Sequence, residues 1–209
     1  MTPTTDRVLR QSYLSRLAEQ VSSLQLSGID PKAANYRSLV TKIKSTGAGL
    51  VYFGGTTQTN AGQIAKDLVA GGAKAKLMVP DGCREFALID SAGADNLNDR
   101  TYVTFGGLPP NQLTGKGAEF YAAYKKKFNA EPEAYAVYGY EAARVVLEGI
   151  RRAGKKDRQA VADAVRQLKD FDGALGKWSF DENGDTTLKV MMVEEIRNGK
   201  FSPVKIVGQ

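Results

Sequence analysis

The sequence contains no histidine and a single cysteine, Cys83. The lack of histidine excludes a Ser–His–Asp triad, a Cys–His pair and any histidine-ligated metal site. One cysteine allows neither an internal disulfide nor a zinc site built from several thiolates. Because no base is available to activate it, we interpret Cys83 as a small, partly buried residue rather than a nucleophile. We therefore predict a protein that is not an enzyme and that holds no metal or other cofactor.

Long apolar runs are also missing. No stretch approaches the roughly 18 apolar residues that a membrane helix needs. Residues 1–26 contain basic side chains but lack the apolar core of about 7–15 residues that defines a secretory signal. Their apolar side chains recur at helical spacing from Val8 to Val21, which predicts a short amphipathic helix. Taken alone, the sequence predicts no route out of the cytoplasm.

The residues that are present are typical of a globular protein. The 209 residues are 42% hydrophobic and 25% charged, which is enough to build a real core. The net charge is +6, with its densest runs at Lys125–Lys127, at Arg151–Arg152 and at Lys155–Lys156. Each run ends an amphipathic stretch, where cations suit the helix dipole. No aromatic or glycine-rich RNA motif accompanies them, so we predict solvated helix ends and no nucleic-acid partner.

Strands and helices alternate in the first half of the chain. Three apolar runs bounded by glycine or proline predict strands over residues 50–53, 76–79 and 101–105. Helical spacing between them predicts helices over 61–68 and 86–89, and a further helix follows the Asp30–Pro31 turn. Such alternation predicts an α/β fold in which a parallel sheet is flanked by helices.

The second half of the chain has a different pattern. Helices are predicted near residues 120–128, 135–152 and 158–169. The first carries an aromatic stripe, Phe120, Tyr124 and Phe128, which we interpret as core.

The last forty residues predict strands. Residues 177–180 and 188–193 read as a hairpin around the Asn183–Gly184 turn, and residues 201–207 as one further strand. The acidic segment 181–185 has the wrong spacing for a calcium loop, which needs glycine at its sixth position and glutamate at its twelfth. We interpret it as the hairpin turn.

Three segments are candidate binding sites. Residues 54–60 follow a strand and open a helix, so Thr56, Thr57 and nearby backbone N–H groups suit a carboxylate, or alternatively cap the helix. Asp81 follows the next strand, at the same sheet edge, and suits a ligand ammonium or, alternatively, a turn. Tyrosines 135, 138 and 140 could wall a ligand pocket or pack between helices.

Several motifs in matching order resemble the leucine/isoleucine/valine-binding proteins, the periplasmic receptors of branched-chain amino-acid ABC importers. The resemblance covers residues 27–208 and is carried by Ile29–Lys32, Tyr52–Thr56, Pro80–Gly82, Tyr135–Ala142 and Trp178–Asp185. It implies a type I periplasmic binding protein fold, whose two lobes close on an amino acid. Residues 27–105 and 174–209 then correspond to the second lobe, and residues 110–172 to helices that return to the first.

The resemblance also implies roles for single residues. Thr56 lines the cleft, Asp81 contacts the ligand ammonium, and Tyr135 packs against the ligand side chain. The family implies a periplasmic location and membrane subunits of an importer as partners. Residues 1–26 do not match, and the first-lobe sheet has no counterpart, so we expect a truncated or split gene product. Helices 110–172 would then expose apolar surface and favour self-association.

Two other functions compete with amino-acid binding for transport. An enzyme on a Rossmann-like sheet would need a phosphate-binding glycine fingerprint, and neither GxGxxG nor GxxxxGK[ST] occurs. A ligand-sensing domain of the same fold would need a fused DNA-binding or signalling segment, for which residues 1–26 are too short. A defunct fragment of a binding protein is the remaining alternative.

Overall fold

The structure is a computed structural model that describes residues 23–208. The chain forms two compact units, residues 1–33 and 34–209. In the described part of the first unit, the Asp30 side chain accepts a hydrogen bond from the Lys32 N–H at 2.9 Å, which confirms the turn at Asp30–Pro31. The helix predicted over residues 8–21 lies outside the described residues.

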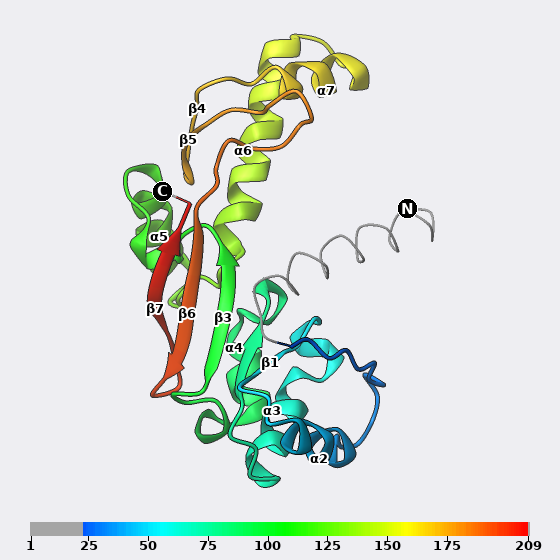
Figure 1. Cartoon of the computed structure of the whole chain (residues 1–209). Helices are drawn as coiled ribbons and strands as arrows, with labels where there is room; N and C mark the ends of the chain where they lie inside the picture. The colour runs from blue at the N-terminus through cyan, green and yellow to red at the C-terminus, as the bar shows by residue number, and fades with distance from the viewer. Residues whose placement is uncertain (1–22, 209) are drawn as a thin grey trace. The chain divides into compact units, whose positions relative to one another are not determined.

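The second unit is built on a five-stranded sheet with the order β1-β2-β3-β6-β7 (Figure 1). The strands β1 (Leu50–Tyr52), β2 (Lys76–Val79) and β3 (Thr101–Gly106) are parallel, as predicted. The strands β6 (Met191–Arg197) and β7 (Lys200–Val207) extend the sheet in antiparallel order. The α/β prediction is confirmed, with a sheet that is mostly parallel.

Helices connect the parallel strands. Helix α2 (Arg37–Thr46) precedes β1, α3 (Ala61–Ala70) joins β1 to β2, and α4 (Phe86–Ala92) joins β2 to β3. Neighbouring helices pack against each other, α2 on α3 and α3 on α4. Four single 3-10 turns fill the connections: η1 (Thr57–Thr59), η2 (Asp81–Cys83), η3 (Ala94–Asn96) and η4 (Pro110–Gln112).

Alternating burial along the strands defines the core. In β2 and β3 every second side chain is buried, as expected for a pleated sheet covered on one face, and β6 follows the same alternation except that Glu195 is buried as well. Each fully buried Val, Leu, Ile, Phe or Met side chain contributes about 1.5–3 kcal/mol to the stability of the fold. The buried strand residues are Leu77, Val79, Val103, Phe105, Met192 and Ile196, and the helices add Ile64, Leu68 and Leu88.

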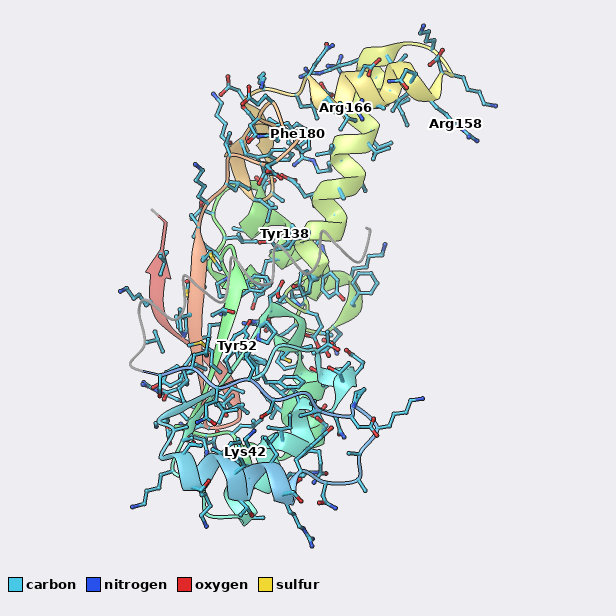
Figure 2. All side chains as sticks on the ribbon, turned by 45° about the vertical axis from the view of Figure 1, so that its right-hand side comes forward. Lys42, Tyr52, Tyr138, Arg158, Arg166 and Phe180 are labelled. Carbon is cyan, nitrogen blue, oxygen red and sulfur yellow. The ribbon has the colours of Figure 1, made fainter. Side chains whose placement is uncertain are left out.

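Three more helices follow β3. They are α5 (Lys116–Phe128), α6 (Ala136–Ala153) and α7 (Arg158–Arg166). Figure 1 shows α6 running from the end of β3 towards α7 and the short antiparallel pair β4 (Phe171–Gly173) and β5 (Gly176–Trp178). A second apolar cluster joins α6 and α7 to this pair: Val145, Leu168, Phe171 and Trp178. Figure 2 shows Phe180 beside this pair, whereas Tyr138 lies near the opposite end of α6.

The hairpin predicted between residues 177–180 and 188–193 is wrong. The 181–185 turn does form, closed by a bridge between Phe180 and Thr186, but β5 pairs with β4 and β6 pairs with β3 and β7. The long hairpin is β6–β7, and its turn is Asn198–Gly199, with φ values of 50° and 66°. Positive φ at both positions is what a tight hairpin turn requires.

The aromatic stripe of α5 is not core. Phe128 is 56% exposed, and Phe120 and Tyr124 are only partly covered. The rings stack on one another and on α6, with centroid distances of 4.6 Å for Tyr124–Phe128 and 4.9 Å for Phe120–Tyr140. The prediction failed because helical spacing identifies an apolar face without showing what covers it.

The basic runs occupy the helix ends, as predicted. Lys125–Lys127 form the last turn of α5, and Arg151 and Arg152 the last turn of α6. The two arginines also bind Glu148 at 2.7 Å, and their hydrogen bonds lower the pKa of that carboxyl to about 2. Among residues 23–208, no helix combines the length and the apolar character that a membrane crossing requires.

Candidate functional site

The first candidate loop begins where β1 ends. Thr56 has an extended backbone, and the single turn η1 follows it. The Thr59 hydroxyl accepts a hydrogen bond from the Thr56 N–H at 2.8 Å and donates one to the Thr56 carbonyl at 2.9 Å. This pair of bonds fixes the loop and keeps Thr56, which is partly exposed, at the carboxyl end of the sheet.

The second candidate loop, Pro80–Cys83, lies directly against the first. A Cβ atom on Gly82 would lie 3.0 Å from Cγ2 of Thr56, so the two loops are in close contact at this point. The Cys83 thiol reaches the Gly55 carbonyl oxygen at 3.7 Å. Thr56 and Asp81 therefore lie in adjacent loops at the same edge of the sheet. This is the arrangement predicted from the sequence, because the carboxyl ends of parallel strands meet at one edge.

Tyr135, the residue before α6, meets this edge from a third segment. Its hydroxyl donates a hydrogen bond to Oδ2 of Asp81 at 2.6 Å. Burial and then the Asp81 carboxylate raise the pKa of Tyr135 well above its ordinary value, so the phenol remains a neutral donor. The resemblance implied a packing role for Tyr135, and the structure adds a polar one.

The ring of Tyr135 packs against other aromatic side chains. The buried ring of Phe105, near the end of β3, meets Tyr135 edge-on at 5.6 Å and Tyr138 edge-on at 5.9 Å. Such edge-to-face pairs stabilise by about 0.5–1.5 kcal/mol beyond simple burial. The Tyr138 hydroxyl donates to the Gly106 carbonyl, and Gly107, at φ 100°, leaves the space that this hydroxyl fills.

The three tyrosines of the 135–140 segment therefore have different surroundings. Tyr135 and Tyr138 face the sheet edge, whereas Tyr140 stacks on Phe120 of α5. Sequence reasoning did not single out Phe105 or Gly107 as site residues. The available signal was the Gly106–Gly107 pair after the third strand, which repeats the Gly54–Gly55 pair after the first.

The side chains of Thr57 and Cys83 lie close together at the same edge of the sheet. The Oγ1 atom of Thr57 is buried without a hydrogen-bond partner in the described part of the chain, and it lies close enough to the Cys83 thiol to lower the pKa of that group slightly. Burial raises the pKa of Cys83 to about 12, so the thiol stays protonated and is a poor nucleophile. Within residues 23–208, no three acidic or cysteine side chains gather as a metal site would require.

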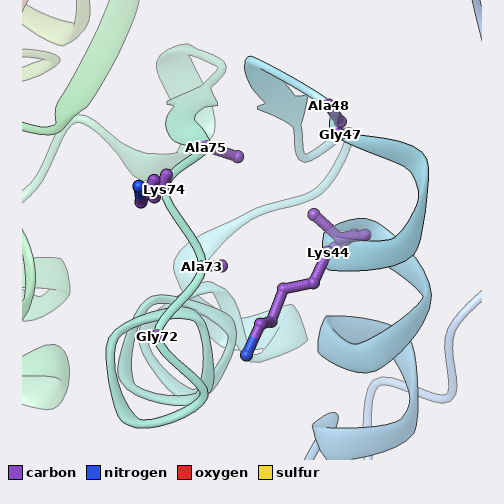
Figure 3. Close-up of a pocket in the computed structure, with 8 residues that line it drawn as sticks. Lys44, Gly47, Ala48, Gly72, Ala73, Lys74 and Ala75 are labelled. Carbon is purple, nitrogen blue, oxygen red and sulfur yellow. The ribbon is translucent and has the colours of Figure 1, made fainter.

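Two hollows of the described surface lie away from this edge. One of about 280 Å³ lies between the end of α2 and the segment before β2, and it is lined by Ile43, Lys44, Gly47, Ala48 and residues 72–75 (Figure 3). Lys44 stands beside it and donates to the Gly71 carbonyl at 2.8 Å. These residues precede β1 and β2, so the hollow is at the amino ends of the strands. Ligands of open α/β sheets bind at the carboxyl ends, where Thr56 and Asp81 stand.

Comparison with known proteins places the chain in a family. A family model described as periplasmic binding protein matches residues 13–200. This chain belongs to the periplasmic binding protein family. The match begins inside segment 1–26, so it extends further towards the amino terminus than the motifs quoted above indicate.

Curated periplasmic binding proteins resemble the chain along most of its length. It is 31% identical to Leu/Ile/Val-binding protein homolog 1 of Brucella suis over 184 residues. This aligned region covers 85% of this chain and 47% of the relative. It is 29% identical over 178 residues to an amino acid binding protein of Pseudomonas aeruginosa, covering 84% and 46%. The chain thus spans about half the length of the curated relatives it matches.

Solved periplasmic binding proteins share the fold. A leucine binding protein from Thermotoga maritima superimposes with a TM-score of 0.86 at 23% identity, covering 96% of this chain and 56% of that one. A second structure is a branched-chain amino acid transporter substrate binding protein from Streptococcus pneumoniae in complex with isoleucine. It superimposes with a TM-score of 0.73 at 24% identity, covering 83% of this chain and 49% of that one. At these identities the likeness establishes the fold alone.

Proposed function

We propose that the chain is a substrate-binding component of an ABC importer for branched-chain or related amino acids. It would bind its ligand without catalysis at a rim made of Thr56, Thr57, Asp81 and Tyr135. One observation carries the proposal: three segments far apart in sequence bring a threonine, a carboxylate and a phenol together where parallel strands end.

The chemistry of this rim suits a zwitterion. The exposed Asp81 carboxylate has one oxygen engaged by Tyr135 and suits a charge-assisted bond to a ligand ammonium. Thr56 offers a hydroxyl beside it, and Thr57 stands next to Thr56 with its own hydroxyl directed inward. The exposed face of Tyr135, which is 48% accessible, suits an aliphatic side chain.

The relatives support the ligand class and the surroundings of the protein. Their names include leucine, isoleucine and valine, and the Streptococcus pneumoniae structure holds isoleucine. We propose a periplasmic location and a partnership with the membrane subunits of an importer on the same ground. Because the chain spans about half of its relatives' length, we expect its own affinity to be weaker than that of a complete two-lobed receptor.

Calorimetry with matched probes tests this function. We expect heat from leucine, isoleucine or valine, and none from isoamylamine or 4-methylpentanoate, which each lack one charge of leucine. Asp81→Asn should abolish the amino-acid signal, whereas Asp95→Asn, a charge removed from another 3-10 turn, should not change it. Binding of the carboxylate without the ammonium would contradict the role of Asp81. Silence towards every amino acid would favour the defunct fragment.

We also propose that two copies of the chain associate through the outer face of α5 and α6. These two helices carry five exposed large apolar side chains, namely Phe128, Tyr140, Val146, Leu147 and Ile150. Helix α5 has Glu119 in its first turn and three lysines in its last turn. Two antiparallel copies would pair these opposite charges, so a second copy is a suitable occupant of this face.

A further inference from the structure

A buried ion pair lies beneath the proposed rim. Arg84 donates from Nε to Glu194 Oε2 at 2.7 Å and from Nη2 to Glu194 Oε1 at 2.9 Å. The two side chains are only 8% and 1% exposed. Glu194 lies on β6, so the pair ties the segment after β2 to a strand more than a hundred residues away.

Arg84 is the residue that closes the Asp81 turn. Its backbone N–H donates to the Asp81 carbonyl at 2.8 Å. A fork of two hydrogen bonds fixes the guanidinium in both position and plane. Fixing the Arg84 side chain therefore also fixes the backbone of the turn that presents the Asp81 carboxylate.

The same guanidinium is linked to Tyr135, the partner of Asp81, through an aromatic ring. It lies over the ring of Phe201 at 4.4 Å and near the ring of Phe105 at 5.9 Å. Phe105 in turn contacts the ring of Tyr135. Through backbone on one side and a ring on the other, Arg84 is linked to both ends of the Tyr135–Asp81 hydrogen bond.

Stability alone does not account for such a pair. A buried ion pair can often be replaced by apolar side chains of similar size at little cost, because the charges lose their hydration. What apolar side chains cannot supply is the directional fork. The loss to be expected from such a replacement is therefore one of geometry at the Asp81 turn.

We propose that Arg84 and Glu194 are positioning residues of the ligand site, which hold Asp81 and Tyr135 in their binding geometry. The identity of the ligand in this inference rests on the proposed function. The contacts among Arg84, Glu194, Asp81 and Tyr135 do not depend on it. Neither side chain needs to touch the ligand. In the described part of the chain, Glu194 binds the guanidinium directly, Phe105 and Phe201 form its apolar walls, and Glu133 is a further carboxylate within electrostatic reach of it.

The main test is the double variant Arg84→Met/Glu194→Leu, which leaves no buried charge unpaired. Arg84→Lys is the second variant, since it keeps the charge and loses the fork. The matched control is Glu195→Gln/Arg197→Gln, which removes both charges of a pair that is 2.6 Å apart on the same strand but has the opposite side-chain direction. Two readouts apply, calorimetric affinity for isoleucine and the pH titration of the ¹³Cζ resonance of Tyr135.

We expect the double variant to keep its thermal midpoint, to lose affinity by about tenfold or more and to titrate Tyr135 at lower pH than the wild type. Arg84→Lys should change both readouts in the same direction by less, and the control Glu195→Gln/Arg197→Gln should change neither. If the double variant does not fold, Arg84→Lys decides. Wild-type affinity together with an unshifted Tyr135 titration in a folded variant overturns the inference. A wild type without amino-acid affinity refutes the proposed function, and the Tyr135 titration then still decides on positioning.

Discussion

Tyr135 donates a hydrogen bond to Asp81 at 2.6 Å, across 54 residues of sequence. The bond joins the start of α6 to the turn after β2, and it sets a neutral donor against the carboxylate that we assign to the ligand ammonium. The geometry leaves the Asp81 carboxylate oriented before any ligand arrives. Binding then requires less ordering of the site, which favours affinity.

The Tyr135–Asp81 bond predicts a pH dependence. Because the pKa of Tyr135 is raised in the folded state, the stability that its phenol contributes is complete below about pH 10, the ordinary tyrosine pKa. That stability is lost as pH rises towards the raised value. Urea unfolding should show wild type more stable than Tyr135→Phe at pH 7 to 9, with the difference shrinking in more alkaline buffer. A difference that grows with pH would contradict the assignment.

Asp81→Asn should lower the pKa of Tyr135. The charge of Asp81 and its strong hydrogen bond are lost, while burial, the largest cause of the shift, remains. The pKa should therefore fall but stay above about 10. The ¹³Cζ resonance of Tyr135, assigned with Tyr135→Phe, reports it directly. An unchanged titration would mean that Asp81 does not hold the phenol in solution.

Gly107→Ala should damage the rim and the stability together. The backbone at φ 100° strains any residue with a Cβ atom, and that atom would overlap the Tyr138 hydroxyl. We expect a loss of about 1–3 kcal/mol in unfolding free energy. Urea unfolding measures it, and Gly139→Ala, where no atom lies within 4 Å of a new Cβ, is the control. Equal effects of the two substitutions would refute the close approach.

Glu141 should be essential for the β4–β5 pair. Its buried carboxylate accepts hydrogen bonds from the Ala174 N–H and from Trp178 Nε1, both at 2.8 Å. Glu141→Ala leaves these donors unpaired, at a cost of about 2–4 kcal/mol. Trp178 fluorescence should shift to longer wavelength. Glu148→Ala, which removes a carboxylate bound by two arginines on the same helix, should leave the emission unchanged.

Self-association through α5 and α6 makes its own prediction. Leu147, which is 65% exposed, is the most accessible of the large apolar side chains described on this face. Leu147→Glu places a charge there and should shift the light-scattering mass from dimer to monomer. Val204→Glu, at a half-exposed position on β7, should leave the mass unchanged. A monomeric wild type would contradict the proposal.

The sequence predicted the parallel half of the fold well because each strand there is a short apolar run that ends at glycine or proline. Residues 76–79 are the predicted and the observed bounds of β2. The same logic placed Thr56 and Asp81 at one edge, since the carboxyl ends of parallel strands coincide. Local pattern and tertiary fold agree in this region.

The antiparallel half was predicted less well because pairing partners are not a local property. Asn183–Gly184 and Asn198–Gly199 are both hairpin signals, and only the second joins two long strands. The Tyr135–Asp81 bond and the Arg84–Glu194 pair were also beyond prediction, since each joins segments whose distance in space depends on the whole fold. The exposed stripe of α5 shows that periodicity identifies an apolar face and not its cover.

The most direct test is an amide NMR titration of the ¹⁵N-labelled chain with L-isoleucine. We predict shift changes that cluster at residues 55–57, 81–83 and 135–138, with saturation at millimolar ligand or below. D-isoleucine should produce smaller changes. Changes confined to the hollow at residues 43–48 and 72–75, or none at any residue, would contradict an amino-acid site at the Asp81 edge.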